Sequence, residues 1–407
     1  MVSSILEMTN NSMKKPLIAL ACGGTGGHLF PGLAIGEEFL RRGCDVMLLI
    51  SPKEVDQQGV KSAVGMQVVT LPAVALRRSH RLEFCAGFWK SFLAARKVFR
   101  SRPPQAVLAM GGFMSAAPIL AGKTCGAATF LHESNTIPGK ANRWLTRIVD
   151  QVFIGFPSAA ARLSNPQTIT TGTPVRPQFQ PADPSACRTA LGLSSQRPVL
   201  LIMGGSQGAS GINGLVLEAL PALVMGEPEL QFLHLTGPSE LETVRAAYAV
   251  SKSKAVVRPF LTEMELALGA ASVVISRAGA SSLAELAAMR VPAILIPYPA
   301  AADNHQFYNA RAFADAGAAL LLEQEEATAD KLAVLVLKLL QDQAAHAAMR
   351  EELVRWHSPH AAAQIVDKIG LRLKARGQGG WDIRDDPSEA GTGTASPRDS
   401  RQIAYSH

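Results

Sequence analysis

Cysteine is scarce in this sequence and is never arranged as a framework. The 407 residues include five cysteines, without a C-x-x-C pair or a histidine-rich stretch beside them: Cys22, Cys44, Cys85, Cys125 and Cys187. Scattered cysteines of this kind argue against a disulfide scaffold and against a structural zinc site. They indicate a protein of a reducing compartment.

Long apolar runs are also missing. No stretch reaches the roughly 18 to 20 apolar residues that a membrane-spanning helix needs. Residues 16–22, after Lys14 and Lys15, faintly imitate a secretory or lipoprotein leader, but the apolar part is short and runs into a glycine-rich loop. We interpret it as the first buried strand of a cytoplasmic protein, preceded by a loose extension over residues 1–14.

Acidic residues are nearly absent between residues 77 and 102. Glu83 is the single acid there, against eight basic residues: Arg77, Arg78, Arg81, Lys90, Arg96, Lys97, Arg100 and Arg102. An aromatic stripe accompanies them at helical spacing: Phe88, Trp89, Phe92 and Phe99. Such a stripe beside cations is typical of a helix resting on an anionic membrane surface. Ordinary packing of the stripe in a core is the alternative.

The whole chain carries a net charge of +7, which favours an anionic partner. Nucleic acid is the other common polyanion, but no zinc-finger, homeodomain or RNP-like aromatic motif is visible. We expect no nucleic-acid partner.

What the sequence does contain is two glycine-rich loops with the same arrangement. GGTGGHLFPG at 23–32 follows the apolar run 17–20, and GGSQGASGIN at 204–213 follows the apolar run 198–203. Glycines between a buried strand and a helix let a ligand approach main-chain N–H groups, and the helix N-terminus adds partial positive charge. Each loop therefore predicts a phosphate site.

A dinucleotide cofactor is the obvious rival for the first loop. The G-x-G-x-x-G fingerprint begins at Gly24, but Leu29 occupies the place of the third glycine. The next predicted strand, 45–50, continues into Ser51, Pro52 and Lys53 and offers no acid for a ribose at its far end. The pattern argues against a nicotinamide or flavin, and we expect no cofactor.

The length and the repeated pattern predict two doubly wound α/β domains that face each other across a cleft. A chain of 407 residues with 47% hydrophobic residues exceeds what one core usually serves. Continuous apolar runs alternate with amphipathic stretches in both halves, as in parallel sheets buried on both faces. We expect an N-terminal domain over 15–176, a Pro-rich linker over 177–196, a C-terminal domain over 197–371 and a disordered tail over 372–407. The last helix of the C-terminal domain could pack back on the N-terminal one.

Seven stretches, taken in order, resemble the MurG family of bacterial glycosyltransferases. Besides the two loops above they are GGFMSAAP at 111–118, HESNTIPGKANRWL at 132–145, GTPVR at 172–176, SRAGASSLAEL at 276–286 and HQFYNA at 305–310. The resemblance covers roughly residues 15–370. Any single glycine loop is weak evidence, whereas the ordered set is specific.

The resemblance implies a GT-B fold and a metal-independent, inverting transfer of N-acetylglucosamine from UDP-N-acetylglucosamine to lipid I, the undecaprenyl-diphosphate-linked muramyl-pentapeptide. The product would be lipid II, a precursor in peptidoglycan synthesis, on which cell shape and division depend. The N-terminal domain would receive the lipid and the C-terminal domain the nucleotide sugar. The family also implies a peripheral location on the cytoplasmic face of the inner membrane, with other wall-synthesis and division proteins as further partners.

The resemblance also implies site residues. The acceptor diphosphate would lie at Gly23, Gly24, Gly111, Gly112 and Ser115. The donor would contact Thr25, Gly26, Gly27, Asn135, Arg176, Ser206, Gln207, Gly208, Leu261, Ala280, Glu285, Gln306 and Asn309. In this set the carboxylate of Glu285 can accept both ribose hydroxyls, and the guanidinium of Arg176 can clamp the leaving diphosphate. Leu261 would offer backbone groups to uracil, and the side chains of Gln306 and Asn309 would reach sugar hydroxyls.

Inverting transfer needs a base beside the acceptor hydroxyl. His28 at the rim of the first loop titrates in the useful range, and Glu133 is the competing carboxylate. Asn135 is expected to position the acceptor or the sugar rather than to transfer a proton.

The chain departs from the usual family pattern at four positions. Phe113 stands where tyrosine is frequent, Ala116 replaces a glycine, Ala278 replaces a serine and His305 replaces a glutamine. These changes affect the acceptor loop and the finer donor contacts. They leave residues 23–28, Arg176 and Glu285 untouched.

Other functions of three kinds compete with this interpretation. A different lipid glycosyltransferase or a UDP-N-acetylglucosamine epimerase would use the same two-domain cleft. A catalytically idle, membrane-associated UDP-sugar-binding partner of wall-synthesis enzymes has no need of both His28 and Glu285. A dinucleotide oxidoreductase comes third.

Overall fold

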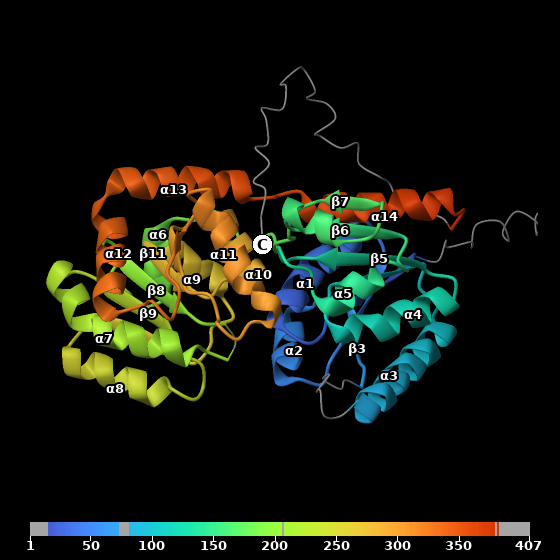
Figure 1. Ribbon diagram of the computed structural model, residues 1–407, viewed down its shortest axis with the longest axis horizontal. Coiled ribbons are helices and arrows are strands. Elements are labelled where there is room, and N and C mark those ends of the chain that lie inside the picture. The colour runs from blue at the N-terminus through green and yellow to red at the C-terminus, as the bar shows by residue number, and fades with distance from the viewer. Residues whose placement is uncertain (1–14, 73–80, 206, 379–380, 382–407) are drawn as a thin grey trace, which may run out of the picture.

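Two parallel sheets, each covered by helices on both faces, lie side by side in the computed structural model (Figure 1), which describes residues 15–72, 81–205, 207–378 and 381. Of the predicted regions, the extension 1–14, residues 77 and 78, Ser206 and nearly all of the tail lie outside the described residues. This arrangement confirms the predicted GT-B-like class.

The N-terminal sheet has seven strands in the order β3-β2-β1-β4-β5-β6-β7. They are β1 (Leu17–Ala21), β2 (Asp45–Ile50), β3 (Gln67–Thr70), β4 (Ala106–Ala109), β5 (Ala128–Glu133), β6 (Gln151–Ile154) and β7 (Thr168–Thr170). Its helices are α1 (Gly26–Arg41), α2 (Glu54–Gly59), α3 (Arg81–Ser101), α4 (Ala116–Thr124) and α5 (Lys140–Leu145), with short 3-10 turns η1 (Val60–Ser62), η2 (Phe113–Ser115) and η3 (Pro157–Arg162).

Both faces of this sheet are buried, which explains the continuous apolar run of β1. Ile18 and Leu20 point into a core shared with α1 and α14 (Ala361–Ala375), whereas Leu17 and Ala19 point into the opposite core with α3 and α4. Successive side chains of a strand face opposite sides of the sheet, so a strand between two helical layers needs apolar residues at every position.

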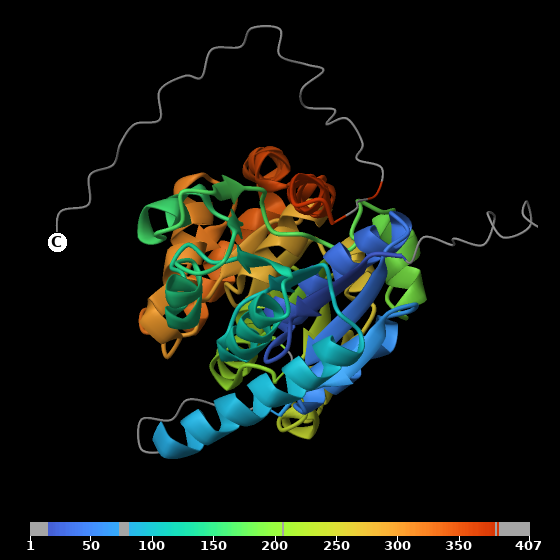
Figure 2. The same cartoon turned by 90° about the vertical axis from the view of Figure 1, so that its right-hand side faces the viewer.

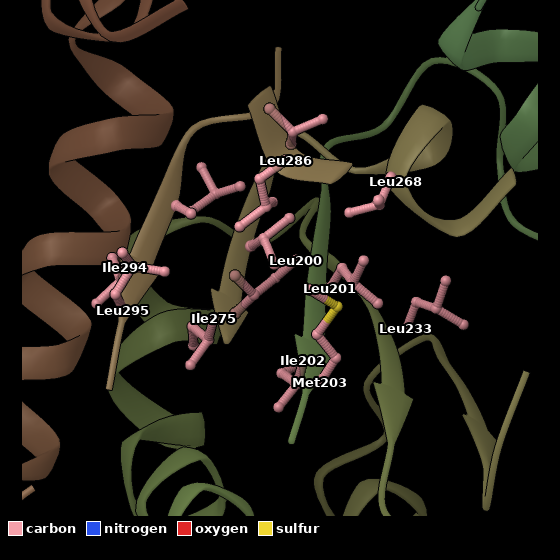
Figure 3. Packing of buried hydrophobic residues seen from close by; sticks show 14 of the residues in the cluster. Leu200, Leu201, Ile202, Met203, Leu233, Leu268, Ile275, Leu286, Ile294 and Leu295 are labelled. Atoms are coloured by element: carbon pink, nitrogen blue, oxygen red, sulfur yellow. The ribbon is translucent and has the colours of Figure 1, made fainter. Parts of the chain in front are cut away.

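The C-terminal sheet has six strands in the order β10-β9-β8-β11-β12-β13. They are β8 (Val199–Met203), β9 (Gln231–Leu235), β10 (Ala255–Arg258), β11 (Val273–Ser276), β12 (Ala293–Leu295) and β13 (Leu320–Leu321). The helices are α6 (Pro184–Ala190), α7 (Ser210–Gly226), α8 (Leu241–Ser251), α9 (Met264–Ala270), α10 (Ala280–Met289), α11 (His305–Asp315), α12 (Ala329–Gln341) and α13 (Gln343–Trp356), with the turn η4 (Ala302–Asn304). Figure 3 shows Leu200, Ile202, Ile275 and Ile294 in the core of this sheet.

The segment 177–196, expected to be a linker, is built into the C-terminal domain. Asp183 caps helix α6 by accepting hydrogen bonds from the backbone N–H groups of Ser185 and Ala186. Phe179 and Cys187 are buried in the C-terminal core, and α6 packs against α9. The free connection between the domains is therefore shorter than the proline content predicts.

The last helix returns to the first domain. After α13 the chain crosses from the C-terminal to the N-terminal domain, and α14 lies along α1 there (Figure 1). Ile365, Val366, Ile369 and Leu373 enter the core beneath β1, and Trp381 packs edge-on against Phe39 with 5.4 Å between ring centroids. The N-terminal core is thus completed by residues near the end of the chain.

Candidate active site between the domains

The first glycine loop, residues 23–27, joins β1 to α1 and can be built only with glycine at its start. A Cβ atom at Gly23 would lie 2.5 Å from the backbone nitrogen of Ser51, and Gly24 has a φ of +117°. Thr25, Gly26 and Gly27 form the start of α1, which has no side-chain cap and no acid in its first turn. This helix end therefore presents N–H groups and partial positive charge to an anion.

A buried carboxylate that the sequence analysis missed holds this loop. Asp56 Oδ2 accepts a hydrogen bond from the Gly24 N–H at 2.7 Å, from the Ser51 N–H at 3.0 Å and from the Ser51 hydroxyl. No acid follows β2 directly, but Asp56 lies in α2, the helix that comes after that strand. Its bonds are structural, because this oxygen is already occupied by three donors.

His28 lies against the second loop of the N-terminal domain, Gly111–Gly112. A Cβ atom at Gly111 would stand 2.8 Å from the imidazole Cε1, and both glycines have positive φ, +113° and +76°. The two glycine loops therefore meet at this ring. Burial lowers the pKa of His28 below its usual value, and the nearby charge of Glu133 opposes that shift. The imidazole is neutral at neutral pH and can accept a proton.

Ser115 supports the second loop from behind. Its hydroxyl lies 2.6 Å from the Gly111 carbonyl and 3.2 Å from the Ala21 carbonyl, and the side chain is fully buried. In this conformation the hydroxyl is turned to the backbone and not to a diphosphate. A contact between Ser115 and the acceptor diphosphate stays a prediction.

Glu133, at the end of β5, is surrounded by donors. Oε1 accepts from the N–H and the side-chain amide of Asn135, at 2.8 and 3.0 Å. Oε2 accepts from the Gly139 N–H at 3.0 Å and the Asn142 amide at 2.7 Å. Because four donors already occupy both carboxylate oxygens, this geometry favours His28 as the base. Asn142 was overlooked, although it lies within the motif 132–145.

Asn309 connects the domains. Its Oδ1 accepts from the Thr136 N–H at 3.0 Å and hydroxyl at 2.9 Å, and its amide donates to Asn135 Oδ1 at 3.0 Å and to the Ala278 carbonyl at 3.2 Å. The side chain is fully buried and binds the opposite domain, and its contact with a sugar hydroxyl stays a prediction. Gln306, one helical turn earlier, is part-buried and accepts from the Tyr298 N–H at 3.0 Å.

The glycine loop of the C-terminal domain, 204–208, is held by tight backbone packing. Gly208 has a φ of +76°, and a Cβ atom there would lie 2.1 Å from the Thr236 carbonyl oxygen. The Asn213 amide donates to the same carbonyl at 2.9 Å and so holds the backbone of Thr236 in place behind the loop. Gln207 is exposed, and Ser206 lies outside the described residues.

Glu285 and Arg176 lie where the two domains meet, close enough for the charge of Arg176 to act on Glu285. Glu285 is on α10, which packs against α1 across the domain boundary, and burial raises its pKa to about 7 although the charge of Arg176 opposes the shift. The Arg176 guanidinium is buried between the rings of Phe30 and Phe179, 4.9 and 5.2 Å from their centroids. Because Phe30 and Phe179 belong to opposite domains, this cation lies where the two domains meet.

The remaining predicted donor residues lie at the same edge of the C-terminal sheet. The Leu261 side chain is buried in the core after β10, which leaves its backbone for contacts, and Ala280 begins α10 with no side-chain cap. Within the described part of the chain, no group of three or more His, Cys, Asp or Glu side chains could hold a metal ion.

An apolar pocket opens beside the acceptor loops, between α3, α4 and α5. It has a volume of about 360 Å³ and is lined by Cys85, Phe88, Trp89, Phe113, Ala116, Lys140, Ala141 and Trp144. Trp89 and Leu93 on α3 are 59% and 57% exposed, whereas Phe99 is fully buried. Within the aromatic stripe Phe99 is core, Phe88 and Phe92 pack partly buried against that core, and Trp89 is exposed, so contact of this helix with a membrane stays a prediction. Figure 2 shows α3 along the outer edge of the domain.

Two parallel α/β sheets, with a glycine-rich loop after β1 in one and after β8 in the other, define the GT-B class of fold. The family models agree: the glycosyltransferase family 28 N-terminal domain matches residues 18–154 and the C-terminal domain of the same family matches residues 199–367. The chain belongs to glycosyltransferase family 28 and, within it, to the MurG family.

Curated relatives support this assignment over nearly their whole length. The chain is 35% identical to a "UDP-N-acetylglucosamine--N-acetylmuramyl-(pentapeptide) pyrophosphoryl-undecaprenol N-acetylglucosamine transferase" of Syntrophus aciditrophicus, with 88% of this chain and 99% of the relative covered. It is 38% identical to the Synechocystis enzyme of the same name, with 81% and 90% covered.

Solved structures share the architecture. The MurG structure from Acinetobacter baumannii matches with a TM-score of 0.66 and 26% identity, over 87% of this chain and 99% of that one. A UDP-N-acetylglucosamine 2-epimerase matches with a TM-score of 0.65, over 92% and 100% of the two chains. At 15% identity the epimerase shows the fold alone.

Proposed function

We propose that this protein transfers N-acetylglucosamine from UDP-N-acetylglucosamine to the C4 hydroxyl of the muramyl sugar in undecaprenyl-diphosphate-muramyl-pentapeptide, converting lipid I to lipid II. The observation that carries the proposal is the neutral imidazole of His28 lying on the Gly111–Gly112 loop at the domain boundary. The names of the curated relatives supply the two substrates.

In this reaction His28 removes the proton of the acceptor hydroxyl. The oxygen attacks the anomeric carbon from the face opposite UDP, the bond from that carbon to the UDP oxygen breaks, and the configuration inverts. Glu133 and Asn142 keep the loop 134–139 in place, and Asn135 orients the sugar. Negative charge moves to the UDP phosphate as the bond breaks, and a cation there stabilises it.

The donor contacts follow from the C-terminal half. Arg176 supplies the cation for the diphosphate, and the open N-terminus of α7 behind Gly208 supplies N–H groups. The ionised carboxylate of Glu285 accepts the ribose hydroxyls, and backbone groups at Leu261 meet the uracil. For Asn309 to reach the sugar, its bonds to Thr136 have to open, so donor binding and domain contact compete for this side chain.

The protein also attaches peripherally to the cytoplasmic face of the inner membrane through α3. Trp89 and Leu93 are exposed there beside Lys90 and Lys97, and no helix of the described residues is long and apolar enough to cross a bilayer. Apolar insertion and attraction to anionic lipids add on such a surface.

Flotation with anionic phospholipid vesicles tests this attachment. Leu93→Glu should reduce the bound fraction several-fold, because a charge replaces an inserted side chain. The matched change Val250→Glu, on the exposed surface of α8, should leave it unchanged. Equal flotation of both variants would show that α3 does not contact the membrane.

The test of the transfer uses labelled UDP-N-acetylglucosamine and a short-chain lipid I analogue, with EDTA present and acceptor omitted as a control. Acceptor-dependent product with an inverted linkage is expected. A changed nucleotide sugar formed without acceptor would identify an epimerase. UDP-sugar binding without any product would identify a binding partner of wall synthesis.

A further inference from the structure

The apolar pocket beside the acceptor loops is larger than packing defects usually are. Its volume of about 360 Å³ falls within the range of small-ligand sites, roughly 300–1,000 Å³. Seven of its eight lining residues are apolar or aromatic side chains or cysteine, and the one charged member is Lys140. Such a lining suits a branched hydrocarbon chain and not a sugar or a peptide.

Its position ties it to the acceptor diphosphate. Phe113 and Ala116 belong to η2 and α4, directly after the Gly111–Gly112 loop. The opposite wall is α5, whose Asn142 binds Glu133 and whose amide nitrogen would lie 3.2 Å from a Cβ atom at Gly111. The pocket therefore adjoins the Gly111–Gly112 loop, where the family resemblance places the acceptor diphosphate.

Charge at the rim fits the same ligand. The Lys140 ammonium is 69% exposed and lies 3.7 Å from the carboxylate of Asp303, to which Arg143 also donates at 2.8 Å. Lys140 thus brings one cation to the rim of the pocket, where it is paired with Asp303. Weak exposed ion pairs of this kind are readily exchanged for a doubly charged ligand.

We propose that this pocket receives the first isoprenoid units of the acceptor's prenyl chain. The inference rests on the proposed function, because it takes the prenyl diphosphate from there. It goes further in giving α3 two apolar surfaces: the exposed Leu93 inserts into the membrane, whereas Phe88 and Trp89 line the pocket that selects the segment of lipid bonded directly to the diphosphate. Acyl chains of the bulk bilayer have no diphosphate at that distance.

Binding of soluble prenyl diphosphates, without detergent or vesicles, tests the proposal independently of any transfer. Farnesyl diphosphate should bind the full-length protein about 10- to 100-fold more tightly than dimethylallyl diphosphate, because further apolar carbons are buried. Isothermal titration gives both dissociation constants. Ala141→Trp, on the part-buried first turn of α5, should fill the pocket and remove this preference.

Ala246→Trp is the matched control, because position 246 is exposed on α8 of the other domain. It should keep the farnesyl preference. Trp144→Ala provides a second pocket variant and should reduce the preference by removing one wall. Unchanged UDP affinity in each variant establishes that the protein is folded.

Equal affinity of the wild type for both prenyl diphosphates would overturn the proposal, as would full preference in Ala141→Trp. If the protein prefers farnesyl diphosphate but transfers no sugar, the prenyl-chain proposal stands and the proposed function is wrong. If the rate of transfer does not depend on the length of the acceptor's prenyl chain, the proposed function stands and the prenyl-chain proposal is wrong.

Discussion

The two strand–glycine–helix units of this protein look alike in sequence but are stabilised by different chemistry. The first is held by the carboxylate of Asp56 and lies beside two more titratable groups, His28 and Glu133. The second is held by packing against the Thr236 carbonyl and by the Asn213 amide, which is itself bonded to the Glu240 carboxylate and to His234 behind the loop. The first unit therefore has a carboxylate and a histidine at the loop itself, whereas in the second unit such groups lie one side chain further back, behind Asn213.

Among the changes that distinguish the two units, His28→Ala should have the largest effect, a loss of kcat. Loss of a general base lowers kcat by roughly 10²- to 10⁴-fold. UDP-N-acetylglucosamine affinity, measured by titration calorimetry, should stay within about twofold because the second unit is untouched. A variant with wild-type kcat would leave water or Glu133 as the base.

Glu285→Gln should have the next largest effect, on the donor side alone. Ribose hydroxyls donate to the ionised carboxylate, and the loss of a charged acceptor should weaken UDP-N-acetylglucosamine binding by about 10- to 100-fold. Acceptor binding should not change.

The pKa of Glu285, about 7, adds a pH dependence with a definite sign. Below pH 7 the carboxyl is protonated and must lose its proton to accept both hydroxyls, so wild-type affinity should fall by up to about tenfold per pH unit. Above pH 7 it should be constant. Titrations from pH 5.5 to 8 should give a flat profile for Glu285→Gln, and a flat wild-type profile would remove the ribose assignment.

Asp56→Ala should have the smallest catalytic effect but a clear cost in stability. It leaves the N–H groups of Gly24 and Ser51 without their acceptor and should lower the free energy of unfolding by about 1–3 kcal/mol. Urea unfolding measures this. Asp315→Ala is the control, because Asp315 is in an exposed pair with Arg311 and should change stability by less than about 0.5 kcal/mol. Similar losses in both variants would show that the loop does not depend on Asp56.

The features predictable from sequence were those that a short stretch determines by itself. The apolar runs of β1 and β8 and the glycines after them predicted two doubly wound domains, because a strand buried on both faces leaves a clear pattern. Asp56 and Asn142 were missed because their roles depend on which loops the fold brings next to them. Asn309 was found, but its partner Thr136 is 173 residues away and belongs to the other domain, so no local pattern could reveal the contact.

The return of α14 to the first domain has a consequence for the order of synthesis. During translation the N-terminal domain emerges from the ribosome first, and domains generally fold as they emerge. Here one face of its sheet keeps an open hydrophobic strip until Ile365, Val366, Ile369 and Leu373 have been made. The newly made N-terminal domain therefore stays partly uncovered until α14 has been synthesised. A fragment of residues 15–176 would keep that strip exposed.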